Sequence, residues 1–265
     1  MGEIFVIGSG ASLNRITEDE AYYVNGAEAV ISFNMYLIFW KRVGIVPTHH
    51  IMLDYVHNRF VYEMVFDTCR KNGFWRTRFL LHRYWEGRIY TDPAVFYWRK
   101  VKRALRGRGP TDMVVVDSRL EIGYLDIGPW DRLEYLWGRG LDERLFHFRG
   151  TLTTAINVAH VLDPHATIKL LGVDLNTPDY FFQDQMPRLI RLKRKEGSSD
   201  LDWEYNLRAG RHGTVLPYGE LPPMTAAFPF IRQQVEATGG RIFCCNKESL
   251  LVEEGHLSYG PVIGD

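Results

Sequence analysis

The segment EIFVIGSGASL, residues 3–13, decides how the rest of the chain is interpreted. It starts as a short apolar strand and then passes through two glycines, Gly8 and Gly10, toward the residues of a helix start. Glycine costs conformational entropy and adds no packing, so two glycines at a strand end indicate a tight turn or the close approach of a ligand. The segment therefore predicts a strand followed by a loop whose backbone is left bare for one of these two reasons.

The composition is that of a globular protein with a sizeable core. The chain has 265 residues, of which 46% are hydrophobic and 24% charged, and its formal net charge is zero. Its three cysteines form neither a C-x-x-C pair nor an even framework, which favours a reducing compartment and argues against a thiolate metal site. No secretory signal pattern is present, and no stretch approaches the ~18 apolar residues that span a bilayer. We expect a cytoplasmic protein with one domain over residues 1–265.

Apolar runs of strand length alternate with helical segments along the chain. The runs cover residues 4–8, 28–34, 49–54, 78–82, 113–117, 167–175 and 241–246. Several are hydrophobic on both faces, a pattern typical of parallel strands that are covered by helices on each side. Helices are expected over residues 151–162 and 224–240, the second of which ends in a glycine pair suited to a C-cap. The predicted fold is α/β, a Rossmann-like, mostly parallel sheet with helices on both faces and a lid-like insertion.

Two segments depart from this alternation. Residues 74–108 contain ten lysines or arginines against two acidic residues, interleaved with nine aromatic residues, so we interpret them as a basic aromatic insertion. Residues 176–223 are polar, rich in glycine and proline, and include the cationic run RLIRLKRK at 188–195. A stretch of this length without clear strands is typical of a lid or a binding loop. We interpret residues 176–223 as a lid.

Polar residues follow several of the predicted strands. In a parallel sheet the ligand crevice lies beyond the carboxyl ends of the strands, so the residues just after each strand are the candidates. The helix expected at 151–162 begins after Arg149, and its free N–H groups and dipole favour an anion such as phosphate. Together these positions supply the amide, carboxylate, hydroxyl and backbone groups needed to hold a nucleotide. The glycine loop alone matches neither a dinucleotide fingerprint nor a P-loop, and a plain tight turn would also explain it.

Five segments resemble the bacterial sialyltransferases that use CMP-sialic acid and the wider group of related Rossmann-like glycosyltransferases. The segments are VIGSGASL (6–13), ISFN (31–34), Arg149-x-Thr151, IKLLGVDL (168–175) and RIFCCNKESLL (241–251). The likeness covers about the first 55 residues, 149–175 and 241–251, and leaves the middle and the lid unmatched.

The resemblance implies a glycosyltransferase that moves a sugar from a nucleotide-sugar donor to an acceptor hydroxyl. In that family a glycine loop and an asparagine after the second strand hold the nucleotide, and an Arg-x-Thr-Ser-Gly segment helps to bind its phosphate and sugar. The donor-binding residues expected here are Gly8, Ser9, Gly10, Asn34, Asp54, Arg149, Thr151, Leu152, Thr153, Gly172, Asp174, Asn176 and Tyr180.

The sequence also departs from the family pattern. Ser9 and Asp54 stand where the family has asparagines, and Leu152–Thr153 replaces its Ser-Gly pair. Tyr180 is close to one of two tyrosines that steady the phosphate in the family, but Asn176 replaces the other. A carboxylate at Asp54 could pair with ribose hydroxyls or a base amino group, yet it would repel a carboxylate on the donor. This argues for a donor other than sialic acid. Asp174 has a second interpretation, in which it pins loops by hydrogen bonds instead of touching the substrate.

Sugar transfer needs a base for the acceptor hydroxyl. The resembled enzymes carry a histidine in the lid before the last helix, and His212 is the only histidine in that region here. The alternative is a solvated surface histidine beside Arg211, in which case Asp200, Asp202 or Glu204 could accept the proton. Asp200 and Asp202 also form a D-x-D pair, but this pair lies in a polar stretch and not at a rigid strand end. We therefore expect a metal-independent reaction with no cofactor.

The basic aromatic segment 74–108 is the candidate acceptor surface. Its cations can neutralise phosphates, and Trp75, Trp85 and Trp98 can stack on bases or sugar rings or lie at a membrane interface. An ordinary solvated helix remains the alternative. The expected partners are thus a nucleotide sugar together with a glycan, a glycolipid reached by peripheral membrane contact, or a nucleic acid such as modified DNA. The acceptor-binding residues expected are Arg99, Lys100, Lys102 and Arg103.

Two other function classes fit the same sequence. A nucleotide pyrophosphokinase or another phosphotransferase on this fold would need Mg²⁺, with Asp54 and Asp174 as candidate ligands. A nucleic-acid-binding protein would use the basic segment alone. Chelation of metal separates the first of these from a glycosyltransferase, and salt-dependent DNA binding without nucleotide turnover identifies the second.

Overall fold

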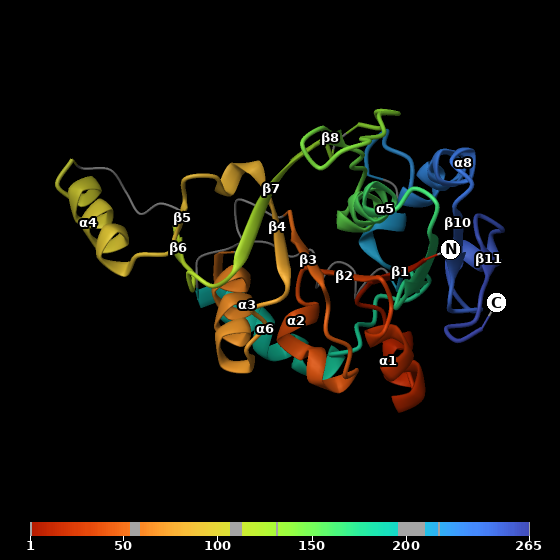
Figure 1. Ribbon diagram of the computed structural model, residues 1–265, viewed down its shortest axis with the longest axis horizontal. Coiled ribbons are helices and arrows are strands. Elements are labelled where there is room, and N and C mark those ends of the chain that lie inside the picture. Colours follow the sequence, from red (N-terminus) through yellow and green to blue (C-terminus); the bar gives the residue numbers. More distant parts are fainter. Residues whose placement is uncertain are drawn as a thin grey trace.

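The computed structural model describes residues 2–53, 59–106, 113–130, 132–195, 210–216 and 218–264. Within them, nine strands pair in parallel in the order β11-β10-β9-β1-β2-β3-β4-β7-β8 (Figure 1). The strands of this sheet are β1 (Glu3–Ile7), β2 (Ala29–Phe33), β3 (His49–Met52), β4 (Arg78–His82), β7 (Glu121–Ile127), β8 (Arg144–Leu145), β9 (Thr167–Leu171), β10 (Arg241–Cys244) and β11 (Ser258–Tyr259). A second, two-stranded sheet joins β5 (Ile89–Tyr90) and β6 (Val114–Val115).

Helices cover both faces of the main sheet. The described helices are α1 (Glu18–Asn25), α2 (Tyr36–Phe39), α3 (Arg59–Asn72), α4 (Pro93–Ala104), α5 (Thr151–Leu162), α6 (Met186–Lys195), α8 (Phe228–Ala237) and α9 (Leu250–Glu253), of which α4 lies beyond the small sheet and not on the main one. Short 3₁₀ segments that matter for the site are η1 (Ala11–Arg15), η5 (Gly213–Val215) and η6 (Met224–Ala227). Figure 1 shows α5 and α8 on one side of the sheet and α1, α2, α3 and α6 on the other. The predicted α/β Rossmann-like fold is confirmed.

The core consists of two layers, because successive side chains of a strand point to opposite faces. In β1, Ile4 and Val6 join the apolar cluster beneath α5 and α8, whereas Phe5 and Ile7 join the cluster beneath the helices of the other face. Helix α5 is buried over residues 151–160, so it lies in the centre of its layer. Strands that must be apolar on both faces explain the continuous hydrophobic runs in the sequence.

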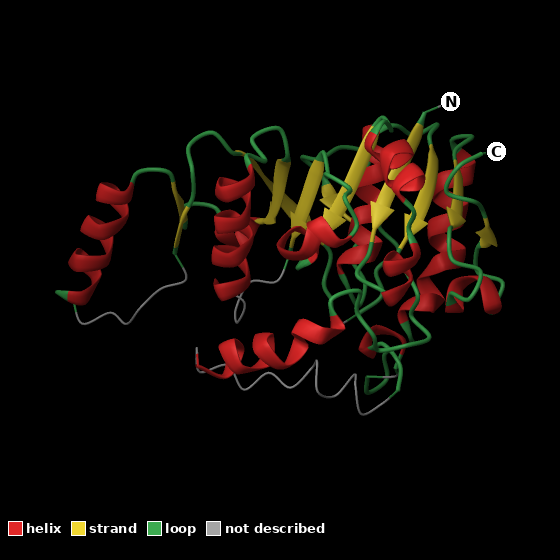
Figure 2. Cartoon of the chain, turned by 90° about the horizontal axis from the view of Figure 1, so that it is seen from below, coloured by secondary structure: helices red, strands yellow, loops and turns green. Residues whose placement is uncertain are grey.

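The order of the strands reverses direction at β1. From β1 the sheet extends through β2, β3 and β4 on one side and through β9, β10 and β11 on the other. Figure 2 shows the strand arrowheads pointing to one edge, where connecting loops gather. In open α/β sheets, ligands bind at the carboxyl edge near such a reversal, so this edge is where the candidate site is sought.

One predicted strand lies elsewhere. The run 113–117 was expected in the main sheet, but Val114 and Val115 pair with β5 in the small sheet. The place next to β4 is taken by β7, residues 121–127, of which residues 121–125 pair with the whole of β4. Strand β7 contains a glycine and two acidic residues and is mostly half-buried, so it lacks the continuous apolar pattern of the other strands.

The structure describes parts of the predicted basic aromatic insertion and of the predicted lid. Residues 74–108 include β4 of the main sheet and also carry β5 and α4. Residues 176–223 are described over 176–195, 210–216 and 218–223, where α6 anchors Met186 and Leu189 in the core. Among the residues described, no helix combines the length and apolarity needed to cross a bilayer.

Candidate functional site

The glycine loop after β1 lies directly against the end of β9. Gly8 N–H donates to the carbonyl of Leu171 at 2.8 Å, and Gly10 N–H donates to the carbonyl of Gly172 at 2.7 Å. A Cβ at Gly8 would lie 2.4 Å from the Gly172 oxygen, and a Cβ at Gly10 would lie 2.5 Å from a carboxylate oxygen of Asp174. Neither spacing is possible for real atoms. The two glycines are therefore required by the approach of neighbouring backbone and by one carboxylate.

Asp174 joins three of the loops at this edge. Its buried carboxylate accepts a hydrogen bond from the backbone N–H of Ser12 at 2.8 Å and another from the Ser12 hydroxyl. The side-chain amide of Asn246 donates to the same carboxylate at 2.8 Å, and Leu250 N–H donates to the Asp174 carbonyl at 2.9 Å. The contacts fit the interpretation of Asp174 as a residue that pins the loops after β1, β9 and β10.

Asn34 directly follows β2, and its backbone adopts the left-handed region, with φ of 53°. Asparagine tolerates this region better than most residues. Its N–H donates to the carbonyl of Ile51 at 3.0 Å, and its carbonyl lies 3.1 Å from Nε2 of His50. A carbonyl can only accept, so Nε2 carries the proton and Nδ1 accepts from the Ser32 hydroxyl at 2.8 Å. Burial lowers the pKa of His50 to about 3, so the ring is neutral and fixes the turn without charge.

The N-terminus of α5 meets the side chain of Asn34. The hydroxyl of Thr151, the first residue of α5, lies 3.4 Å from Oδ1 of Asn34. Gly150 precedes the helix and offers no side-chain oxygen to the N–H groups of the first turn. These N–H groups and the positive end of the helix dipole therefore lie beside an amide and a hydroxyl. This is the combination expected to attract an anion.

The next two residues of α5 serve the packing of this turn. Leu152 belongs to the apolar cluster beneath α5. The Thr153 hydroxyl is buried, accepts from Phe148 N–H at 2.9 Å and donates to the Gly150 carbonyl at 3.0 Å. The side chains of these predicted donor-binding residues thus shape the start of α5 from inside the fold.

Arg149 links α5 to the segment that carries His212. It has a positive φ of 59°, and its guanidinium donates to the carbonyls of Leu216 at 2.7 Å, Gly213 at 3.0 Å and Pro222 at 3.3 Å. These three hydrogen bonds from one side chain to backbone carbonyls hold this part of the predicted lid against the start of the helix.

His212 lies at the same edge. Its backbone N–H donates to the Leu175 carbonyl at 3.4 Å, and its ring centroid is 6.1 Å from that of Tyr180. Tyr180 itself forms an antiparallel bridge with Gly10. Burial lowers the pKa of His212 to about 4, so the imidazole is neutral at pH 7. Its Nδ1 accepts a hydrogen bond from the Thr214 N–H at 3.4 Å and lies 2.8 Å from the Thr214 hydroxyl. A backbone N–H can only donate, so the proton of the neutral ring is on Nε2 in this geometry.

The remaining predicted residues lie in different places. Ser9 accepts from Phe181 N–H at 3.1 Å through its carbonyl, and Asn176 donates to the Glu248 carbonyl. Arg99, Lys100 and Lys102 lie on α4, which both views place at the far end of the molecule from β1 (Figures 1 and 2). Arg103 is also part of α4. The structure therefore does not bring the predicted acceptor residues beside the predicted donor residues. Asp54, Asp200, Asp202 and Glu204 lie outside the described residues.

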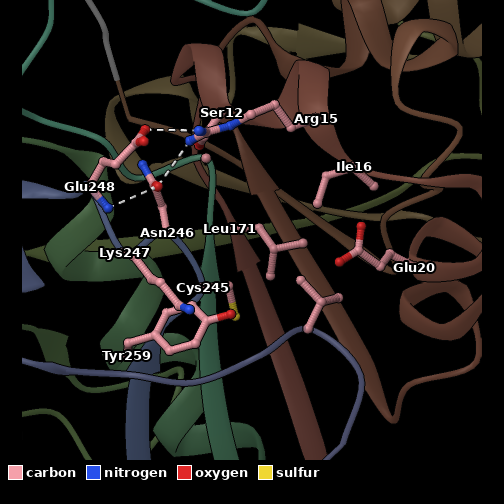
Figure 3. A pocket seen from close by; sticks show the side chains of 12 residues that line it. Ser12, Arg15, Ile16, Glu20, Leu171, Cys245, Asn246, Lys247, Glu248 and Tyr259 are labelled. Atoms are coloured by element: carbon pink, nitrogen blue, oxygen red, sulfur yellow. Dashed lines mark hydrogen bonds and ion pairs between the residues drawn. The ribbon is translucent and has the colours of Figure 1, made fainter.

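A pocket of about 240 Å³ opens beside the Asp174 loops (Figure 3). It is lined by residues that follow β1, β9 and β10 and by the C-terminal segment: Ser12, Arg15, Ile16, Glu20, Leu171, Gly172, Cys245, Asn246, Lys247, Glu248, Tyr259 and Val262. Arg15 pairs with Glu248 at 2.8 Å and donates to the Asn246 side chain at 3.0 Å. The Lys247 ammonium lies 4.7 Å from the ring centre of Tyr259.

This pocket was not predicted from the sequence. Asn246 is the last residue of the predicted strand 241–246, and the polar residues Lys247 and Glu248 directly follow it, so the rule that places ligands beyond strand ends could have identified them. Across the described ranges, no group of three or more His, Cys, Asp or Glu side chains is arranged to hold a metal ion.

The fold and the residues at the carboxyl edge of the main sheet define an α/β protein of the Rossmann-like class. Its candidate anion site lies near β1, where the order of the strands reverses. No protein-family model matches the chain, and a comparison with curated proteins finds no match. Among solved structures, the chain is similar to the sialyltransferase CstII from Campylobacter jejuni in complex with the substrate analogue CMP-3FNeuAc. The identity is 13% and the TM-score 0.50, over 100% of this chain and 89% of that one.

Two further structures are similar at lower TM-scores. The monofunctional alpha-2,3-sialyltransferase Cst-I from Campylobacter jejuni has 12% identity and a TM-score of 0.48, with coverage of 100% and 82%. The MAf glycosyltransferase from Magnetospirillum magneticum has 17% identity and a TM-score of 0.36, over 66% of this chain and 23% of that one. At these identities the likeness to CstII is one of fold.

Proposed function

We propose that this protein is a glycosyltransferase that transfers a sugar from a nucleotide-sugar donor to an acceptor hydroxyl. One observation carries the proposal: the glycine loop, Asn34, the N-terminus of α5 and the His212 segment meet at the carboxyl edge of β1, β2 and β9. The fold is shared over the whole chain with a sialyltransferase whose structure holds a CMP-sugar analogue.

The donor phosphate is assigned to the start of α5. The N–H groups of the first turn and the side-chain NH₂ of Asn34 are the donors at this point, and the Thr151 hydroxyl donates to Oδ1 of Asn34 and so orients that amide. When the bond between the anomeric carbon and the phosphate oxygen breaks, the nucleotide leaves with the electron pair and gains negative charge. A helix N-terminus stabilises that charge because its dipole is already oriented.

His212 is assigned as the base that takes the proton of the acceptor hydroxyl. Proton transfer to Nε2 uses the other tautomer of the neutral ring, in which Nδ1–H donates to the Thr214 hydroxyl and the contact from the Thr214 N–H is given up. The acceptor oxygen then forms the new bond to the anomeric carbon while the nucleotide departs. This chemistry needs no redox cofactor, and we propose that it proceeds without a metal, so chelation with EDTA should leave the rate unchanged. Loss of turnover on chelation would favour a Mg²⁺-dependent phosphotransferase instead.

Nucleotide binding is the direct test. A thermal-shift screen with CMP, UDP, GDP and ATP should find one nucleotide that raises the melting temperature, since a ligand that binds the folded state stabilises it by mass action. Asn34→Gly should weaken the affinity for that nucleotide by about tenfold or more, because the substitution removes a hydrogen bond to a charged ligand. Glycine is the proper substitution here, since it accepts the φ of 53° without strain.

Asn72→Gly, at the end of α3 and away from the edge, is the matched control and should leave nucleotide affinity unchanged. Both variants should melt as cooperatively as the original chain. The proposal fails if no nucleotide shifts the melting temperature, or if titration calorimetry shows the same affinity for Asn34→Gly as for the unaltered protein.

A further inference from the structure

Helix α4, residues Pro93–Ala104, stands apart from the body of the protein. Figures 1 and 2 both show it at one end of the long axis, beyond the small sheet of β5 and β6. Its attachment is made by one side of the helix. Phe96 is buried with its ring 6.1 Å from that of Tyr90, and Arg99 donates to the Tyr90 hydroxyl at 3.1 Å.

The outward side of α4 and the turn after it form an apolar stripe. Tyr97, Trp98, Val101 and Leu105 recur at helical spacing and are 62%, 66%, 52% and 82% exposed. Exposure of large apolar side chains to water is unfavourable in free energy, and here four of them are contiguous on one face. The stripe therefore fits an apolar environment that the described part of the chain does not provide.

Cations flank this stripe. Lys100 and Lys102 lie on either side of it by helical rotation, and both are exposed. Residues 93–106 contain five lysines or arginines and no acidic residue. An apolar stripe bordered by lysines and carrying a tryptophan matches the surface of a bilayer with anionic headgroups, where the stripe enters the acyl boundary and the lysines meet the phosphates.

We propose that α4 is an amphipathic helix that binds the surface of an anionic membrane. Figure 2 shows α4 at one end of the molecule, beyond the small sheet, so a surface that approaches this end meets α4 before the main sheet. Nucleic acid would engage the cations but would leave Val101 and Leu105 in water. A second copy packed stripe to stripe would bring five cations near five others, which is unfavourable. The inference is independent of the proposed sugar transfer, because vesicle binding requires neither donor nor turnover.

Cosedimentation of the full chain with lipid vesicles tests the proposal. The protein should bind vesicles of phosphatidylcholine with phosphatidylglycerol much more tightly than vesicles of phosphatidylcholine alone, and binding should weaken as salt is raised. Replacement of Lys100 and Lys102 by glutamine should lower the partition coefficient by about fivefold per lysine. The double variant Trp98→Ser, Leu105→Ser should lower it by roughly tenfold or more.

Matched controls lie elsewhere on the surface. Tyr22→Ser removes an 84% exposed aromatic from α1, and Arg139→Gln removes an exposed cation. Neither should alter vesicle binding. Brominated lipids should quench tryptophan fluorescence in the original chain, and Trp98→Phe should lose this quenching while it keeps most of the binding. All the substituted side chains are exposed, and an unchanged melting temperature will show that each variant folds.

Three results would overturn the proposal. One is equal binding to neutral and anionic vesicles, or none to either. Another is a loss of binding in the control variants as large as that in the α4 variants. The third is a dimer in sedimentation velocity that the Trp98→Ser, Leu105→Ser variant abolishes, or DNA binding without vesicle binding, since either would assign the stripe or the cations to another partner.

Discussion

At the residue scale, Gly8 shows why the chain leaves its backbone bare. The absent side chain makes room for the carbonyl of Gly172, which passes 2.4 Å from the position that a Cβ would take. Gly8→Ala should therefore lower the free energy of unfolding by roughly 2–3 kcal/mol through overpacking. Gly44→Ala is the control, because Gly44 has a φ of 76° and open space around it, and about 1 kcal/mol of backbone strain is expected. Equal losses for the two variants in urea titrations would refute the steric explanation.

His212 and Thr214 are predicted to act as a pair. His212→Ala should lower turnover by about 10²–10⁴-fold while donor affinity stays nearly intact, because only the proton transfer is lost. Thr214→Val should cause a smaller loss, since the ring then lacks the partner that orients Nδ1. Burial lowers the pKa of His212 to about 4, so the rate should be level above that pH and fall below it as the base becomes protonated. An unaltered turnover number in His212→Ala would remove it as the base.

At the element scale, Arg149 connects the start of α5 to η5 and to the loop before η6. Arg149→Ala should weaken these connections by on the order of 2 kcal/mol, because a guanidinium that binds three carbonyls is lost. The positive φ at this position affects alanine and arginine equally, so backbone strain cancels in the comparison.

Hydrogen exchange is the measurement for this variant. Amides of residues 213–216 and 218–221 should exchange faster in Arg149→Ala, while those of β1 and β9 keep their protection. Unchanged exchange in these residues would show that the segment is held by other contacts.

The elements also show what the sequence could predict. Strands with continuous apolar runs were located within a few residues, and the helix at 151–162 has the predicted bounds, because burial on both faces leaves a strong local pattern. The strand β7 was missed, since it is half-buried and mixes acidic residues with a glycine. The partners of the glycine loop could not be predicted, because Gly8 and Gly172 meet only through the pairing of β1 with β9.

The candidate site follows the same logic. Asn34 and Thr151 were predicted as site residues from their positions at a strand end and a helix start. Their side-chain oxygens, Oδ1 of Asn34 and the Thr151 hydroxyl, lie 3.4 Å apart. The pocket beside Asp174 was not predicted, because its Arg15–Glu248 ion pair joins distant parts of the sequence, although Glu248 itself lies shortly after a predicted strand. The binding roles of Asn34 and Thr151 remain predictions that the nucleotide screen addresses.

At the scale of the whole molecule, buried histidines such as His50 and His147 link the stability of the fold to pH. His50 lies in β3 beneath the Asn34 turn, and His147 lies in the segment before α5, with Nδ1 2.9 Å from the Thr154 hydroxyl. Burial lowers the pKa of His50 to about 3 and that of His147 to about 4. An unfolded histidine titrates near pH 6.5, so below that pH the unfolded state binds more protons than the folded state.

The free energy of unfolding should therefore be fully expressed above about pH 6.5 and fall progressively toward pH 4, with His147 contributing about 3 kcal/mol of the loss. His147→Gln should flatten this fall, because an amide can hydrogen-bond to Thr154 and cannot be protonated in this range. Urea titrations at pH 7, 6, 5 and 4 give the comparison. If His147→Gln and the original chain lose stability in parallel as the pH falls, proton uptake at His147 does not govern the acid sensitivity of the fold.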